Sequence, residues 1–123
     1  MTIPRIVIAA YRPKPGKADV LLAEVRDHHH LLRSEGLATD RKPVIMRASD
    51  GTILEIFEWA SPAAIEEAHA NPRVQAMWAR FEGVCDYVPL NTIAESAQPF
   101  AGFEPLDLHL TPIIQPDPDH RAE

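Results

Sequence analysis

The spacing of apolar residues predicts that strands and helices alternate along most of the chain. Residues 3–12 are apolar on both alternating faces, which is typical of a strand covered on both sides. Residues 17–35 repeat apolar side chains at three- and four-residue intervals, which predicts an amphipathic helix ending at Gly36. Residues 44–49 and 52–60 are predicted to be strands joined by a two-residue hairpin turn.

Two helix-start signals follow these strands. Ser61 before Pro62, and Asn71 before Pro72, each combine a capping side chain with a proline suited to the first helical turn. We therefore expect two helical pieces with a break near Asn71, the second carrying a clear apolar stripe. Residues 89–95 are then expected to supply a short fourth strand.

The predicted order of elements indicates an α+β fold of the ferredoxin-like βαββαβ type with an antiparallel four-stranded sheet. Helices cover only one face of such a sheet. In the third strand, however, Ile53 and Phe57 alternate with Leu54 and Ile56, so both faces are apolar. A second copy of the same sheet is the simplest cover for the free face, and we expect a face-to-face homodimer.

The chain is expected to divide into one domain, residues 1–95, and a proline-rich C-terminal arm, residues 96–123. The arm holds five of the 12 prolines and has no helical period. Its alternating Leu106, Leu108 and Leu110 suit an extended segment lying on a sheet edge or on a partner.

Composition and charge exclude several classes of partner. The net charge of −6 disfavours binding to nucleic acid, which requires clustered lysine and arginine. No apolar run reaches the roughly 18 residues of a membrane span, so no membrane partner is expected. Cys85 is the only cysteine, which fits a reducing compartment, and the chain is predicted to be cytoplasmic.

Two residues of the third strand are candidates for chemistry. Glu55 shares a face with Ile53, Phe57 and Trp59, and an apolar setting favours a raised pKa and a general base. The alternative is a structural ion pair with Arg47 across the hairpin. Trp59 either stacks on a planar substrate or belongs to the core.

The histidines do not predict a metal site. His28, His29 and His30 are consecutive on a helix, so they point about 100° apart and cannot converge on one ion. His28 shares the apolar face and can reach a cavity or close a polar network in the core. His69 ends the first short helical piece, where it either caps carbonyl groups or moves a proton.

Residues 3–95 resemble the antibiotic biosynthesis monooxygenase-like family of the dimeric α/β-barrel superfamily. The resemblance rests on the segment Tyr11-x-Pro13-x-Pro15-Gly16, on Glu58, Trp59 and Ser61, and on Ala68, His69, Asn71, Pro72 and Trp78. It implies a dimeric α/β barrel. Members include cofactor-free oxygenases of aromatic polyketides and haem-degrading enzymes.

Residues carried over from the family match in part. Trp59 stands where the anthrone oxygenases have a tryptophan, whereas Glu55 stands where they have an asparagine. Arg80 can correspond to the arginine of these oxygenases, and Ile65 lies near the position of their tyrosine. Haem degradation is disfavoured for two reasons. The first strand has Ala10 and Tyr11 where the haem-degrading members have an asparagine, and Trp78, not a histidine, stands near the position of their iron-binding histidine.

The resemblance, taken with these candidate residues, implies a cofactor-independent monooxygenase acting on a small aromatic or polyketide-like substrate. The alternative is a non-catalytic dimer of the same fold, either structural or binding a small apolar ligand. The predicted catalytic residues are Glu55, Trp59, His69 and Arg80. The predicted substrate-binding residues are Tyr11, His28, Arg47, Phe57 and Trp78. No cofactor or metal is expected.

Overall fold

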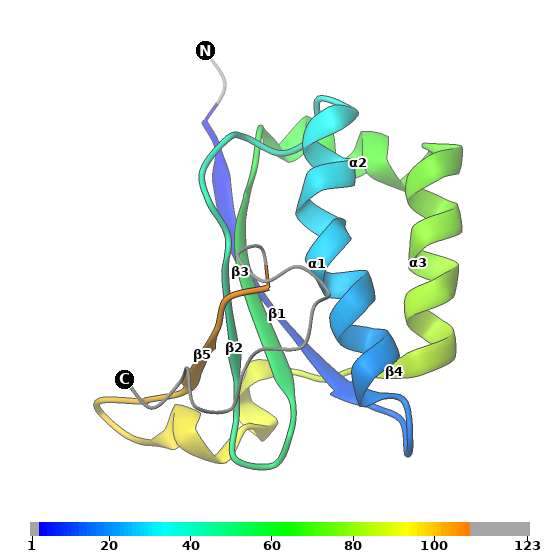
Figure 1. The fold of residues 1–123 in the computed structure, drawn as a ribbon. Helices are drawn as coiled ribbons and strands as arrows, with labels where there is room; N and C mark the ends of the chain where they lie inside the picture. Colours follow the sequence, from blue (N-terminus) through cyan, green and yellow to red (C-terminus); the bar gives the residue numbers. More distant parts are fainter. Residues whose placement is uncertain (1–2, 109–123) are drawn as a thin grey trace.

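The structure is a computed structural model that describes residues 3–108 of the chain (Figure 1). Its three helices and single antiparallel sheet form an α+β fold. The strands and helices are β1 (Arg5–Pro13), α1 (Ala18–Ser34), β2 (Val44–Arg47), β3 (Ile53–Trp59), α2 (Pro62–His69), α3 (Pro72–Val84), β4 (Cys85–Tyr87) and β5 (Glu104–Leu106). The five strands lie in the order β4-β1-β3-β2-β5.

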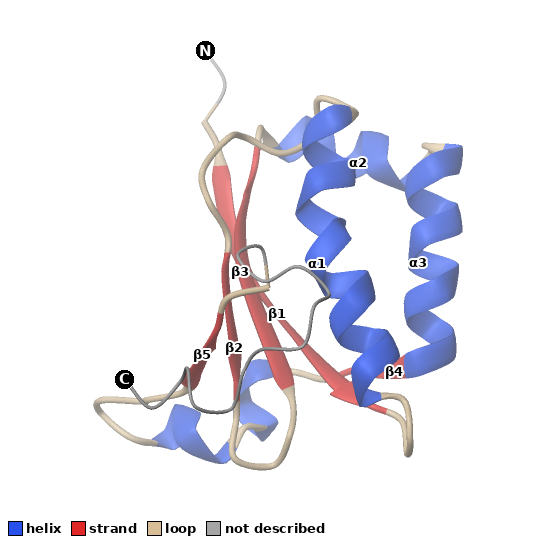
Figure 2. Cartoon of the chain, viewed as in Figure 1, coloured by secondary structure: helices blue, strands red, loops and turns tan. Residues whose placement is uncertain are grey.

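All three helices lie on one side of the sheet, as Figure 2 shows. Leu21, Val25 and Leu32 of α1 are buried at the spacing the sequence predicted, and they face the sheet. None of the helices among residues 3–108 is both long and apolar enough to cross a membrane.

The predicted break between α2 and α3 is confirmed. Ser61 caps α2 by accepting a hydrogen bond from the backbone N–H of Ala64 at 3.1 Å. Asn71 caps α3 by accepting from the N–H groups of Arg73 and Val74 at 2.9 and 3.1 Å. Each helix has a proline in its first turn, where the N–H that proline lacks would have no partner within the helix. Each helix therefore begins directly after its capping residue.

The prediction of a fourth strand at residues 89–95 is wrong. The fourth strand is β4, which follows α3 directly and pairs with Tyr11–Pro13 of β1. Residues 90–92 and 94–97 instead form two short 3-10 turns, after Pro89, which has no N–H to donate to a ladder.

The sheet has five strands, whereas the sequence predicted four. The additional strand, β5, comes from the C-terminal arm and pairs with the edge of β2, so that Leu106 lies opposite Ile45. An extended segment on a sheet edge was expected of this arm. Leu110, which belonged to the same expected segment, lies outside the described residues.

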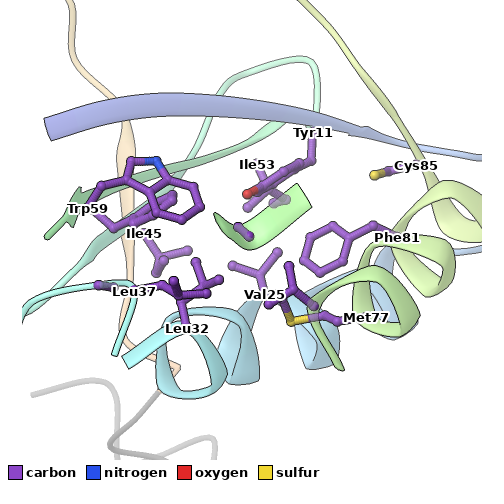
Figure 3. Packing of buried hydrophobic residues seen from close by; sticks show 14 of the residues in the cluster. Tyr11, Val25, Leu32, Leu37, Ile45, Ile53, Trp59, Met77, Phe81 and Cys85 are labelled. Atoms are coloured by element: carbon purple, nitrogen blue, oxygen red, sulfur yellow. The ribbon is translucent and has the colours of Figure 1, made fainter. Parts of the chain in front are cut away.

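The main core lies between the sheet and the helices (Figure 3). Tyr11 of β1, Trp59 of β3 and Phe81 of α3 are each no more than 6% exposed. A smaller cluster lies on the opposite face of the sheet, where Ala10 and Leu54 pack with Ile93. The chain itself therefore covers part of the face that the sequence assigned to a second copy.

Within residues 3–108, another part of that outer face is exposed. Ile6 and Ile8 of β1 are 52% and 47% exposed, and Val44 of β2 is 51% exposed. Ile8 lies opposite Ile56 of β3, which in turn lies opposite Val44, so an apolar row crosses three strands.

Candidate functional site

A cavity of about 340 Å³ lies on the helix side of β1. Its walls come from β1, β3, β4 and the three helices. Six aromatic side chains line it: Tyr11, Phe57, Trp59, Trp78, Phe81 and Tyr87. The polar lining residues are His28, His69 and Glu82. This combination of an apolar wall and few polar groups is typical of a small-molecule site.

The space exists because β1 changes the size of its helix-facing side chains. Val7, Ala9 and Tyr11 alternate on that face, and the first two are small. Tyr11 packs against Phe81 with ring centroids 5.1 Å apart, and both rings line the cavity. The large rings of Phe57 and Trp59 on the neighbouring strand form the adjacent wall.

Glu55 lies behind the cavity wall, fully buried. Its Oε1 accepts a hydrogen bond from the hydroxyl of Tyr11 at 2.6 Å. Nδ1 of His28 is 2.9 Å from Oε1 and 3.1 Å from Oε2. A buried carboxylate requires such donors, because it has lost its water. Tyr11 and His28 supply these donors to Glu55, which does not itself line the cavity.

The alternative pairing of Glu55 with Arg47 is wrong. Ile45 stands opposite Glu55 in the ladder, and Arg47 stands opposite Ile53. The guanidinium of Arg47 instead donates to Glu104 of β5 at 3.0 and 3.1 Å. β5, which the C-terminal arm adds to the edge of the sheet, therefore pairs with the guanidinium that the sequence offered to Glu55.

His28 connects Glu55 to the cavity. Nδ1–H donates a hydrogen bond to the Glu55 carboxylate, and in that tautomer the lone pair of the ring lies on Nε2. Within residues 3–108, Glu55 is the only hydrogen-bond partner of this ring. The ring lies edge-on to Phe57, with centroids 5.2 Å apart, and lines the cavity. This geometry suits a base oriented by a carboxylate.

Burial sets the protonation of two further cavity residues. Burial and the neighbouring Glu55 raise the pKa of Tyr11 well above its ordinary value, so its hydroxyl stays a donor. Burial, with smaller effects from Cys85 and Glu82, raises the pKa of Tyr87 to about 12.

Burial disfavours the thiol of Cys85 as a nucleophile. Cys85 is 2% exposed, and burial raises its pKa to about 11, so the thiolate is scarce at neutral pH. The residue belongs to the main core, as the sequence indicated.

Two candidates combine structural and cavity positions. Trp59 is 6% exposed, belongs to the core and also lines the cavity. Nδ1–H of His69 donates to the carbonyl of Ile65 at 2.8 Å, which is the capping role the sequence offered. The same ring lies 5.1 Å from that of Trp78 and lines the cavity.

The remaining candidates lie elsewhere. Arg47 and Arg80 do not line the cavity, and Nε of Arg80 donates to Glu24 at 3.1 Å. His30 is exposed, while Nε2–H of His29 donates to the carbonyl of Thr39 at 2.9 Å. In residues 3–108, no three His, Cys, Asp or Glu side chains group closely enough to hold a metal ion.

Sequence reasoning missed Glu82 and Tyr87. Tyr87 lies on β4, which was predicted elsewhere in the chain. Glu82 follows Trp78 by one helical turn on α3, so the two share a face of that helix. The i,i+4 spacing was the available signal for Glu82, but an exposed glutamate on a helix more often faces only solvent.

Comparison of the chain with protein-family models, with curated proteins and with solved structures finds no match. The cavity and its hydrogen bonds therefore carry the functional argument.

Proposed function

We propose that the chain is a cofactor-independent monooxygenase of the antibiotic biosynthesis monooxygenase-like type, acting on a small aromatic or polyketide-like substrate. One observation carries the proposal: His28, hydrogen-bonded through Nδ1 to the buried Glu55, forms part of an aromatic-lined cavity. The strand order β4-β1-β3-β2 supports a ferredoxin-like domain, to which β5 is added at one edge.

The base of the reaction is His28 rather than Glu55. Nε2 of His28 removes a proton from an acidic phenol or anthrone, and Glu55 stabilises the imidazolium that results. The substrate carbanion passes an electron to O₂, and the two combine to a hydroperoxide. For a methylene carbon, loss of water then leaves a carbonyl, so one oxygen atom enters the product and the other departs with both hydrogens.

The other cavity residues hold the reactants. Trp59 and Trp78 line the cavity, where stacking on a planar substrate is favourable. Tyr11 fixes the Glu55 carboxylate, which makes Glu55 and Tyr11 positioning residues. His69 is the second proton carrier that lines the cavity. Arg47 and Arg80 have no part in this mechanism.

Oxygen uptake with a panel of anthrones and hydroquinones tests the proposal. His28→Gln should lower kcat about 100-fold or more, the usual contribution of a general base, with a smaller effect on KM. Glu55→Gln should also lower kcat, because the ring of His28 loses its orienting acceptor. Arg80→Gln is the matched control and should leave uptake unchanged. Full uptake by His28→Gln would remove His28 as the base.

The proton-transfer step can be measured separately. Under anaerobic conditions the wild-type protein should exchange the acidic C–H of an anthrone for deuterium, and His28→Gln should not. Exchange without any uptake once O₂ is admitted would retain the base and refute the oxygenase.

A second candidate is a non-catalytic module that binds a small apolar ligand. The six aromatic rings around an open cavity favour it, because they supply binding without any proton transfer. In that case a ligand should bind wild type and His28→Gln with similar affinity, and no substrate in the panel should consume oxygen.

We also propose a face-to-face homodimer, the dimeric α/β barrel. The open row of Ile8, Ile56 and Val44 supports it, since a second copy of the same row provides a self-complementary apolar cover.

A further inference from the structure

The cavity lining holds a carboxylate that no lysine or arginine of the same lining offsets. Glu82 is the only carboxylate among the described lining residues, and that lining contains no lysine or arginine. Glu55, directly behind Tyr11 and His28, adds a second carboxylate, and its two hydrogen-bond donors are a hydroxyl and an imidazole. A ligand in the cavity therefore meets the carboxylate of Glu82 and lies near that of Glu55.

Nearby cations do not compensate for Glu82. Arg80 pairs with Glu24 at 3.1 Å, and Lys14 pairs with Asp86 at 3.1 Å. Within residues 3–108, Glu82 itself takes part in no ion pair. Its charge reaches the cavity wall, because it is one of the groups, after burial and Cys85, that raise the pKa of Tyr87.

We propose that Glu82 determines specificity: the cavity accepts uncharged and cationic aromatic compounds and rejects those that carry a carboxylate or phosphate. The inference rests on the proposed function, from which it takes the aromatic ligand. It adds which charge that ligand can carry. An anionic substituent approaching within several ångströms of Glu82 loses about three- to tenfold in affinity, since the side chain is exposed and partly screened by solvent. A cationic substituent gains a similar factor.

Three probes with one ring system test the charge directly. 2-Naphthol, 6-hydroxy-2-naphthoate and 6-aminomethyl-2-naphthol differ in the charge of one substituent. Isothermal titration calorimetry at pH 8.5, anaerobically and in low salt, should give the order cationic, uncharged, anionic from tightest to weakest. Glu82→Gln should compress the order, and Glu82→Lys should reverse it. At about 0.5 M salt the differences should shrink, because exposed charges are then screened.

Asp19→Asn provides the control. Asp19 is an exposed residue of α1 that does not line the cavity, and its substitution changes the net charge as Glu82→Gln does. It should leave the order of the three probes unchanged. Thermal unfolding of each variant checks that the exposed substitutions leave the fold intact.

The outcomes separate the specificity from the activity. Equal affinity of the wild type for naphthoate and naphthol overturns the inference, whatever the oxygen uptake. An order that Glu82→Lys leaves unchanged also overturns it. Binding in the expected order without oxygen uptake refutes the oxygenase alone. Failure of all three probes to bind overturns the inference, and the oxygenase is then decided by oxygen uptake with the anthrones alone.

Discussion

The buried carboxylate of Glu55 accepts hydrogen bonds from two side chains, Tyr11 and His28. Hydrogen bonds to a charged group are stronger than those between neutral groups. Removing one of them also leaves the buried charge short of a donor, which costs further free energy. The same pair of bonds orients the imidazole toward the cavity. Stability and the proposed base therefore depend on the same three side chains.

Removal of the Tyr11 hydroxyl tests this dependence. Tyr11→Phe should lower the free energy of unfolding by about 2 kcal/mol, the usual range for a hydrogen bond to a buried charge. Urea unfolding at pH 7.5 measures it. In a Glu55→Gln background the same substitution should cost clearly less, because the charge is gone. An equal cost in both backgrounds would contradict the charge-assisted bond.

His29 makes stability depend on pH. Burial lowers its pKa, although the hydrogen bond to the Thr39 carbonyl raises it in part. As pH falls below about 6.5, the unfolded chain takes up the proton before the folded one, so acid removes stability. His29→Gln keeps a donor for Thr39 and should lose less stability than wild type between pH 7.5 and 5.5 in urea unfolding. Parallel losses in the two proteins would contradict this role.

At the scale of residues, the sequence predicted the features that depend on a single strand or helix. The apolar neighbours of Glu55 on its strand indicated burial, and helical spacing placed His28 on the apolar face. The bond between them joins residues 27 positions apart in the chain. No local pattern gives such a contact, because it depends on how α1 lies across the sheet.

At the scale of elements, the caps were the most predictable feature. Ser61 and Asn71 act locally, so each cap depends on a few residues of sequence. β4 has three residues and follows α3 without a turn residue, and its first residue, Cys85, continues the apolar stripe of the helix. Because the apolar spacing continues from α3 into Cys85, the sequence did not predict a strand there. An extended segment on a sheet edge was expected around Leu106, but its pairing with β2 was not, because that pairing depends on an edge far away in the sequence.

The Asn71 cap should have a measurable effect on stability. Its Oδ1 accepts two backbone hydrogen bonds, and its Nδ2 donates to Glu35 of the α1 C-terminus at 3.0 Å. Asn71→Ala should lower the free energy of unfolding by about 1 kcal/mol or somewhat more, since both functions are lost. Asn71→Ser retains an acceptor and should recover most of the capping. Urea unfolding that ranks serine no better than alanine would contradict the capping account.

At the scale of the molecule, the two faces of the sheet differ in how they are covered. Helices and the main core cover one face. On the other, Ile93 covers Ala10 and Leu54, while the row through Ile8 remains open. The sequence predicted that both faces are apolar, but it did not show that residues 88–103 cover part of the second. The surface left for a partner is smaller than the sequence implied.

The dimer prediction therefore concerns this open row. Wild-type protein at micromolar concentration should sediment with twice the chain mass of 13.7 kDa. Ile8→Lys should give the single-chain mass, because a lysine on the row has to lose water in the interface. Val20→Lys is the matched control: Val20 is 48% exposed, like Ile8 at 47%, but it lies on α1. It should remain dimeric. A wild-type mass of one chain would refute the dimer, and dissociation by Val20→Lys alone would move the interface to the helical side.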